Sequence, residues 1–130
     1  MIVVDASAVI EILLRTPAAK AVEARMFDPA ETLHAPHLLD VEVAQVIRRY
    51  AVGGMIDADR GRVALDDLVD LPVRRYSHAV LLPRVWELRN NFTAYDAVYV
   101  ALAEALDATL LTRDTRLAAA PGHRARIECV

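Results

Sequence analysis

Apolar and polar positions alternate along the chain in two rhythms, which predict strands and helices in turn. Short apolar or β-branched runs predict strands at residues 2–4, 32–34, 72–76, 109–112 and 126–129. Between them, apolar residues recur every three or four positions, which predicts helices at residues 7–14, 17–27, 38–50, 57–69, 78–89, 94–106 and 115–119. Strands that alternate with helices favour an α/β fold, in which a parallel sheet carries helices on both faces.

Glycine and proline set the ends of two predicted elements. The Gly-Gly pair that begins at Gly53 ends the strongly periodic helix at 38–50, because glycine closes a helix at little steric cost. Pro36 is expected to lie beyond the strand at 32–34, since proline cannot donate to a sheet ladder.

Four acidic residues fall at positions that bear on function. Asp5 directly follows the first predicted strand, and Asp114 comes just after the fourth. Asp96 lies in the first turn of an otherwise apolar helix, and Glu42 falls on the stripe that an earlier helix would bury. Because the C-terminal ends of parallel strands share one edge of a sheet, two strand ends and two helix positions can converge there.

Each of these acids also has a purely structural interpretation. Asp5 is placed to cap the helix that follows it, as Ser7 is. Residues 93–96 have the form of a capping box, and Asp114 is an ordinary N-cap for the next helix. Glu42 is the hardest to explain in this way, because acidic side chains are almost never fully buried without a partner. The structural interpretation weakens for the four together, since all would have to be incidental in one geometrically sensible set.

Carboxylates gathered at one edge require a counter-charge. At a separation of ~4–5 Å, each pair repels by about 3–4 kcal/mol at an effective dielectric constant near 20. Either some acids take up protons or a cation neutralises them. All candidate ligands are hard oxygens, which favours Mg²⁺ or Mn²⁺ over zinc. Such an ion activates water and offsets phosphoryl charge, so the acids predict hydrolysis of a phosphodiester or phosphomonoester.

Composition and charge narrow the choice of protein class. The 130 residues predict a single domain, 1–130, and the 55% apolar content supplies a full core with a surplus for partners. Fifteen basic residues against 18 acidic ones give a net charge of −3, which argues against binding nucleic acid by bulk positive charge. All basic residues except Lys20 are arginines, which bind phosphate well. The lone Cys129 excludes an internal disulfide and favours a cytoplasmic protein, and no apolar run is long enough to predict a membrane span.

The residues around the four acids resemble the PIN-domain ribonucleases, specifically the VapC-type toxins of bacterial toxin–antitoxin pairs. The motifs that carry the resemblance lie at residues 3–7 (VVDAS), 35–44 (APHLLDVEVA), 93–97 (TAYDA) and 110–114 (LLTRD). Each motif is weak alone, but the four occur in order over almost the whole chain. Gln45 departs from the family pattern, in which asparagine is frequent, and the departure concerns only local helix packing or the groove surface.

The resemblance implies a fold, an activity and partners. The fold would be a three-layer α/β/α domain with five parallel strands in the order 3-2-1-4-5. The activity would be that of a Mg²⁺- or Mn²⁺-dependent endoribonuclease, which hydrolyses RNA phosphodiester bonds with metal-activated water. The protein would be a homodimer, neutralised by a small VapB-type antitoxin whose tail covers the acidic groove, within a higher toxin–antitoxin assembly.

The resemblance also assigns roles to particular residues. Asp5 and Asp96 would be the most direct metal ligands, and Ser7 and Thr112 would hold the carboxylates or a water in position. The full acidic quartet, which would be both catalytic and metal-binding, is Asp5, Glu42, Asp96 and Asp114.

Three arginines near the acids are candidates for contact with substrate or antitoxin. Arg48 and Arg49 lie within two turns of Glu42, and Arg113 adjoins Asp114. Alternatively, the first two belong to a solvated helix face, and Arg113 forms an ion pair with a nearby acid. Four large aromatic residues are expected to be core or dimer anchors, namely Tyr50, Tyr95, Tyr99 and Trp86.

Two other function classes compete with the nuclease. One is another acidic-pocket phosphohydrolase or phosphoryl-transfer receiver, but these need a late lysine, whereas Lys20 is early. A small phosphatase would also open with Asp-x-Asp, where this chain has Asp5-Ala6-Ser7. The other is a non-catalytic PIN-like binding module, which would show a broken set of acids, whereas this set is intact.

Overall fold

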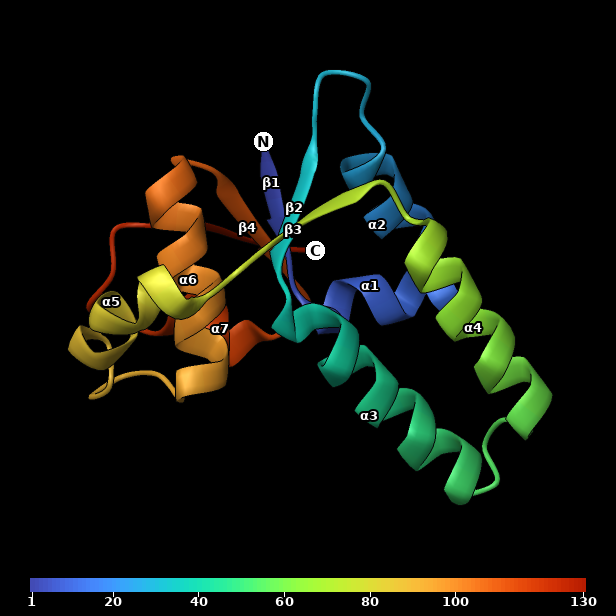
Figure 1. Ribbon diagram of the computed structural model, residues 1–130. Coiled ribbons are helices and arrows are strands. Elements are labelled where there is room, and N and C mark those ends of the chain that lie inside the picture. The colour runs from blue at the N-terminus through green and yellow to red at the C-terminus, as the bar shows by residue number, and fades with distance from the viewer.

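Five strands and seven α-helices alternate along residues 1–130 in the computed structural model of the protein (Figure 1). The strands are β1 (Ile2–Val4), β2 (Leu33–Pro36), β3 (Val73–Tyr76), β4 (Thr109–Thr112) and β5 (Arg126–Cys129). The helices are α1 (Ala6–Leu13), α2 (Ala19–Met26), α3 (Leu38–Val52), α4 (Ala58–Asp70), α5 (Leu82–Glu87), α6 (Ala94–Leu106) and α7 (Thr115–Ala119), with a 3₁₀ turn η1 (Ala79–Leu81) before α5. The predicted α/β class is confirmed.

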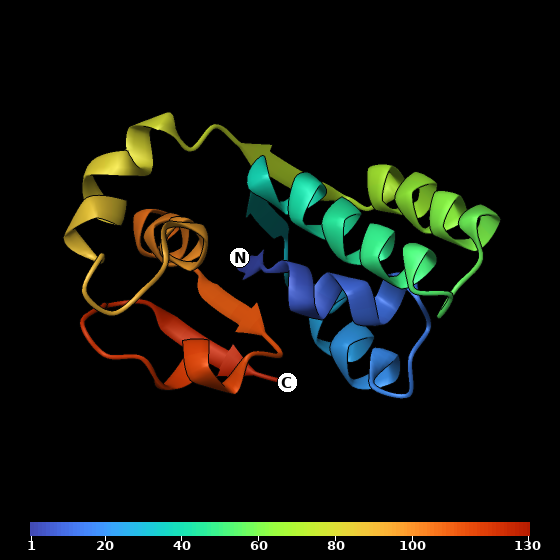
Figure 2. The same ribbon diagram turned by 90° about the horizontal axis from the view of Figure 1, so that it is seen from below.

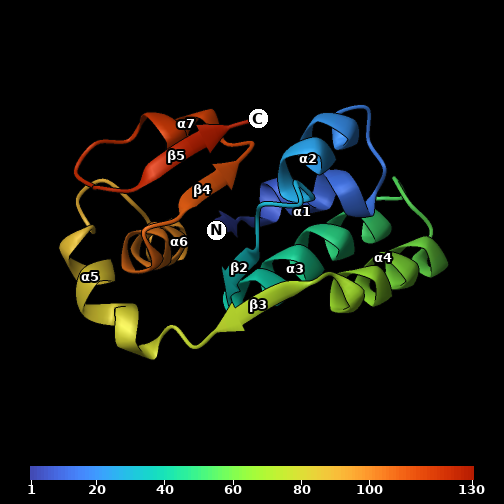
Figure 3. The same cartoon turned by 90° about the horizontal axis from the view of Figure 1, so that it is seen from above.

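All strands pair in parallel, in the order β3-β2-β1-β4-β5, as the family resemblance implies. Helices α5 and α6 cover one face of the sheet, and α1 to α4 lie on the other, which gives three layers (Figures 2 and 3). Helices α3 and α4 run side by side and extend past the sheet (Figure 1). None of the helices combines the length and the apolar composition that a bilayer crossing requires.

The central strand, β1, lies in the middle of the hydrophobic core. Ile2, Val3 and Val4 are fully buried, because helices cover both faces of the sheet at this point. The register pairs Val4 of β1 with Leu111 of β4. Asp5 and Thr112 are the next residues along these two strands, so they lie at the same level of the C-terminal edge of the sheet.

Several predicted bounds shift by one or two residues, since α2 begins at Ala19 rather than at residue 17 and α3 ends at Val52 rather than at residue 50. Two further differences lie next to prolines. The strand predicted at 32–34 continues through Pro36. Although Pro36 has no N–H to donate, the next residue supplies a hydrogen bond to β3, because the His37 N–H donates to the Tyr76 carbonyl at 2.9 Å. The single helix predicted at 78–89 is instead η1 followed by α5. Proline fits the first turn of a helix but interrupts its interior, so a new helix begins at Leu82, with Pro83 in its first turn.

Candidate functional site

Asp5 follows β1 directly and is held rigidly. Its Oδ1 accepts hydrogen bonds from the Ala8 N–H at 3.1 Å, which caps α1, and from the Ser7 hydroxyl at 2.6 Å. Its Oδ2 accepts one from the Thr112 hydroxyl. The side chain is buried, and burial raises its pKa, although these hydrogen bonds oppose the rise. The capping interpretation of Asp5 is thus confirmed, and the same contacts fix the carboxylate at the sheet edge.

Ser7 and Thr112 tie the ends of β1 and β4 together around Asp5. Besides donating to Asp5, their hydroxyl oxygens lie 3.3 Å apart. The Ser7 hydroxyl accepts from the Arg113 N–H, and the Thr112 hydroxyl accepts from the Asp114 N–H, both at 2.9 Å. Both residues therefore contact the acid that they are predicted to support.

Glu42 lies in the second turn of α3, at the border of the stripe that this helix buries. The side chain is half-buried, while its Oε1 atom is fully buried and has no hydrogen-bond partner. Burial raises the pKa of Glu42, the nearby Tyr99 hydroxyl opposes the rise, and the charges of Asp96 and Asp5 add to it. A buried carboxylate oxygen without a partner is costly, so this one requires an explanation.

Asp96 and Asp114 lie close enough for the charge of one to act on the other. Asp96 is in the first turn of α6, where the Thr93 hydroxyl caps the helix by accepting from the Asp96 N–H at 3.2 Å. Asp114 caps α7 by accepting from the N–H groups of Arg116 and Leu117 at 2.9 and 3.3 Å. Burial raises the pKa of Asp96, and the charge of Asp114 raises it further. Both line a hollow of about 250 Å³.

We call this set of four acids the acidic edge: Asp5, Glu42, Asp96 and Asp114. Carboxylate charge links its members, because Asp96 acts on both Asp5 and Glu42, and Asp114 acts on Asp96. As the side chains stand, no three His, Cys, Asp or Glu side chains are close enough together to enclose a metal ion. The structure thus gathers the predicted acids at one edge, and their roles as metal ligands stay a prediction.

The donor chemistry of the acidic edge fits a hard divalent cation. Its members offer only carboxylate oxygens, which Mg²⁺ and Mn²⁺ prefer. Burial next to like charge raises the pKa of three of the four acids, Asp5, Glu42 and Asp96. A cation would offset this like charge.

The arginines near the acidic edge differ in their surroundings. Arg113 forms an ion pair with Glu11, Nε to Oε1 at 3.4 Å, as its structural interpretation predicts. Arg48 and Arg49 are exposed on α3, and Arg49 lines a hollow of about 530 Å³ together with Glu42. Contact of these three residues with substrate or antitoxin stays a prediction.

Two residues at the acidic edge are not among the site residues predicted from the sequence. Arg116 is exposed, lines the hollow of Asp96 and Asp114, and has its Nε 3.9 Å from Asp114 Oδ1. Tyr99 is buried close to Glu42, three positions after Asp96. The spacing from Asp96 places Tyr99 on the same face of α6, and this signal could have identified it.

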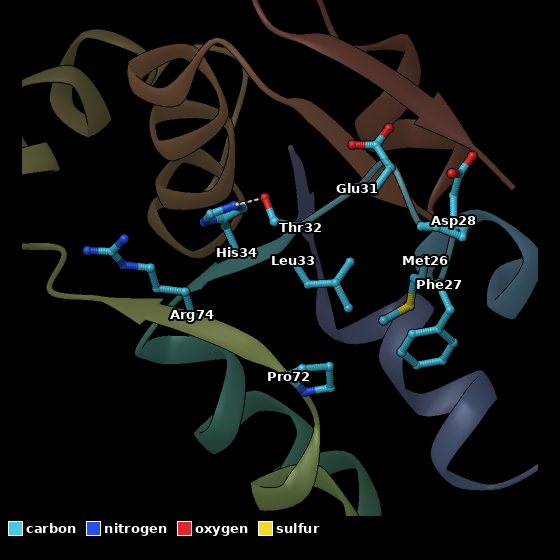
Figure 4. Close-up of a pocket in the computed structure, with 10 residues that line it drawn as sticks. Met26, Phe27, Asp28, Glu31, Thr32, Leu33, His34, Pro72 and Arg74 are labelled. Atoms are coloured by element: carbon cyan, nitrogen blue, oxygen red, sulfur yellow. Dashed lines mark hydrogen bonds between the residues drawn. The ribbon is translucent and has the colours of Figure 1, made fainter.

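A hollow of about 630 Å³ lies away from the acidic edge, at the N-terminal ends of β2 and β3 (Figure 4). Met26 and Phe27 at the end of α2 line it, together with His34 and Arg74 (Figure 4). None of the four acids borders it. It is larger than the hollows at the acidic edge, and the two acids that line it, Asp28 and Glu31, lie before the start of β2.

Comparison with known proteins agrees with this geometry. The family model described as "PIN domain" matches residues 2–122. Ribonuclease VapC12 of Mycobacterium tuberculosis is 45% identical over 130 residues, which cover 100% of this chain and 99% of that protein. Ribonuclease VapC1 of the same organism is 46% identical over 129 residues, covering 98% and 96%.

A solved structure shows the same fold. It is the crystal structure of VapBC2 from Rickettsia felis, bound to a DNA fragment from their promoter. It superimposes with a TM-score of 0.74 over 99% of this chain and 98% of that one. At 14% sequence identity, this likeness concerns the fold alone.

Proposed function

The chain belongs to the PIN-domain family, within its VapC group. We therefore propose that it is a metal-dependent endoribonuclease and the toxin of a toxin–antitoxin pair. The observation that carries the proposal is the convergence of four carboxylates at the C-terminal edge of the sheet. The full-length similarity to proteins named as ribonucleases supports RNA as the substrate. We take residues 1–130 as one PIN domain.

The reaction we infer is hydrolysis of an RNA phosphodiester bond. The oxygen of water bonds to phosphorus in line with the departing 3′ oxygen, and the products are a 5′-phosphate and a 3′-hydroxyl. The chain's part is to fix carboxylates around the reacting phosphate. Ser7 and Thr112 hold the Asp5 carboxylate at the sheet edge, while the starts of α3 and α6 present Glu42 and Asp96.

A Mg²⁺ or Mn²⁺ ion is the cofactor that the acidic edge would hold. Asp5 and Asp96 would be its direct ligands, and Glu42 and Asp114 would complete the set. When bound, such a cation lowers the pKa of water and offsets negative charge on the phosphoryl group. The oxygen-only donor set and the like charge that acts on Asp5, Glu42 and Asp96 support this assignment.

Arginines bordering the hollows at the acidic edge would bind the RNA backbone. Arg49 would act beside Glu42, with Arg48 next to it, and Arg116 would act beside Asp96. Arg113 would exchange its ion pair with Glu11 for a phosphate or for an acidic group of the antitoxin. Without such cations, the acids would repel the substrate.

A VapB-type antitoxin is the protein partner we propose. Support comes from the similar structure of VapBC2 from Rickettsia felis, whose name denotes a toxin–antitoxin pair. The hollow beside Glu42 offers a place for the antitoxin tail, because it adjoins a second, mainly apolar hollow of about 180 Å³ through Leu38 and Tyr95. An antitoxin segment lying there would block the acidic edge.

A homodimer is the assembly we propose, as the unit from which a larger toxin–antitoxin complex forms. Large apolar side chains are exposed on α3, α5 and the start of α6, namely Val41, Leu82, Trp86 and Tyr95. A second copy and the antitoxin tail, which would lie against Val41, Leu82 and Tyr95, would together cover them. Light scattering at micromolar concentration should therefore give the mass of a dimer, and a monomer mass would contradict the dimer.

Cleavage of RNA by purified protein tests the proposed function. With Mn²⁺, wild-type protein should generate new RNA 5′ ends, and EDTA should stop the reaction. Asp5→Asn should lower the rate by at least about 100-fold, since even residues that only support metal ligands contribute about 10- to 100-fold. Asp66→Asn, an exposed acid on α4, is the matched control and should cleave normally.

The alternatives predict other outcomes of the same experiment. Binding of an antitoxin with no cleavage of any RNA would indicate a non-catalytic PIN-like module. Hydrolysis of small phosphomonoesters without RNA cleavage would indicate another acidic-pocket phosphohydrolase. If both Asp5→Asn and Asp96→Asn cleave RNA at the wild-type rate in EDTA, the metal-dependent mechanism is wrong.

A further inference from the structure

Two buried polar atoms without hydrogen-bond partners lie close together next to the acidic edge. They are Oε1 of Glu42 on α3 and the hydroxyl of Tyr99 on α6. Tyr99 is only 2% exposed, so water does not reach its hydroxyl freely. Buried donors and acceptors are rarely left unpaired, because each unpaired group loses its hydration without compensation.

The chemistry of the two groups makes them complementary. A phenol can donate one hydrogen bond, whereas an ionised carboxylate can only accept. Three carboxylates are near enough for their charge to act on Tyr99, those of Glu42, Asp5 and Asp96. Both oxygens of Asp5 already accept from Ser7, Ala8 and Thr112.

Glu42 is the better of the two remaining acceptors. Its Oε1 is buried and free, and it belongs to a half-buried side chain near the start of α3. Asp96 is in the first turn of α6, the helix that carries Tyr99, and it lines the hollow that Asp114 also lines.

We propose that the Tyr99 hydroxyl donates a hydrogen bond to Oε1 of Glu42 and thereby positions this carboxylate at the acidic edge. Tyr99 then holds Oε1 of Glu42, and Oε2 is left to face the other carboxylates. Tyr99 is accordingly a positioning residue for RNA cleavage, a role that rests on the proposed function. The hydrogen bond itself does not.

The experiment compares Tyr99→Phe with wild-type protein in two measurements. The first is the urea midpoint of unfolding without divalent ions. Removing a donor that pairs with Glu42 should lower the midpoint, whereas removing an unpaired buried hydroxyl should leave it unchanged or raise it. The second is the affinity for Mn²⁺ alone, measured by calorimetry, which should weaken by about 10- to 100-fold because the Glu42 ligand loses its support.

A double-mutant cycle separates positioning from general damage to the core. Glu42→Met removes the acceptor at similar size, so adding Tyr99→Phe to it should lower neither the midpoint nor the residual Mn²⁺ affinity further. Tyr50→Phe, on α3 two turns beyond Glu42, is the matched control and should retain both wild-type values. Equal effects of Tyr99→Phe in the two backgrounds would overturn the proposal.

Failure of the proposed function gives a different pattern. If wild-type protein neither binds Mn²⁺ nor cleaves RNA, the nuclease assignment and the positioning role fall together. The urea midpoints of the cycle still decide whether the Tyr99–Glu42 hydrogen bond exists. If wild-type protein binds Mn²⁺ and Tyr99→Phe binds it equally well, only the positioning role is wrong.

Discussion

Several residues of this protein serve the backbone and the acidic edge at once. Asp5 and Asp114 cap α1 and α7, and the same two carboxylates lie at the ends of β1 and β4. The structural and functional interpretations of these acids are therefore compatible. A cap needs a carboxylate fixed beside a helix N-terminus, and a fixed carboxylate is also what a metal site needs.

His34 is the residue for which the structure predicts a pH effect on stability. It is buried, with Nδ1 2.7 Å from the Tyr76 hydroxyl and Nε2 2.8 Å from the Thr32 hydroxyl. Burial lowers the pKa of His34, and the positive charges of the N-terminus and Arg74 lower it further. The folded state then binds fewer protons than the unfolded state. This contribution to stability is present above the ordinary histidine pKa of about 6.5 and is lost as the pH falls below it.

The measurement is the free energy of unfolding in urea at pH 7.5 and at pH 5.5, for wild-type protein and His34→Gln. The loss between the two pH values should be smaller in His34→Gln, because the variant lacks the group that must be kept neutral. His78→Gln, at an exposed histidine, is the control. Equal losses in wild-type protein and His34→Gln would show that His34 does not contribute to the pH effect.

At the scale of elements, helix α3, which carries Glu42, packs against α4. The two helices approach closely at Gly61, a buried position inside α4. A Cβ atom there would lie 3.1 Å from Ile47 Cγ2 of α3 and 3.7 Å from Ile56 Cδ1. Close packing explains a glycine inside a helix, where it costs about 1 kcal/mol relative to alanine.

Gly61→Leu should therefore destabilise the protein, even though leucine favours helix. The added side chain would force α4 away from α3 or displace Ile47, and such overpacking costs about 1–3 kcal/mol. Urea unfolding of the variant measures the loss. Arg62→Leu, at the exposed neighbouring position of α4, is the control for helix propensity. A Gly61→Leu protein as stable as wild type would mean that the contact between the helices is loose.

At the scale of the whole molecule, charge is concentrated rather than spread. The net charge is only −3, yet four of the 18 acidic residues lie at one edge of the sheet. Burial raises the pKa of Asp5, Glu42 and Asp96, so the folded state holds protons on them more tightly than the unfolded chain. Without divalent ions, this contribution to stability is complete at low pH and is lost as the pH rises through their folded pKa values.

A divalent cation should reverse that trend, because it binds the deprotonated carboxylates. We expect Mn²⁺ to raise the melting temperature more at pH 7.5 than at pH 5.5, in proportion to its tighter binding. Chelation should remove the increase, and Asp96→Asn should abolish most of it. An equal shift at both pH values, or one that persists in Asp96→Asn, would place the cation elsewhere on the protein.

Local patterns along the chain determined much of this structure. The helices at 94–106 and 115–119 and the strands at 109–112 and 126–129 occur at the predicted bounds, because periodicity and capping residues act between near neighbours. The four acids could be placed at one edge for a related reason. Each lies at the end of a strand or near the start of a helix, and in a parallel sheet those ends coincide.

Contacts between elements distant in sequence were decided only by the tertiary structure. Four aromatic residues look alike as apolar anchors, yet Tyr99 is buried near Glu42, while Tyr95 and Trp86 are exposed. Arg113 pairs with Glu11 across some hundred positions of the chain. Periodicity tells which face of a helix is apolar, but the partner that meets that face depends on how all the elements pack, and this packing is set by the whole core at once.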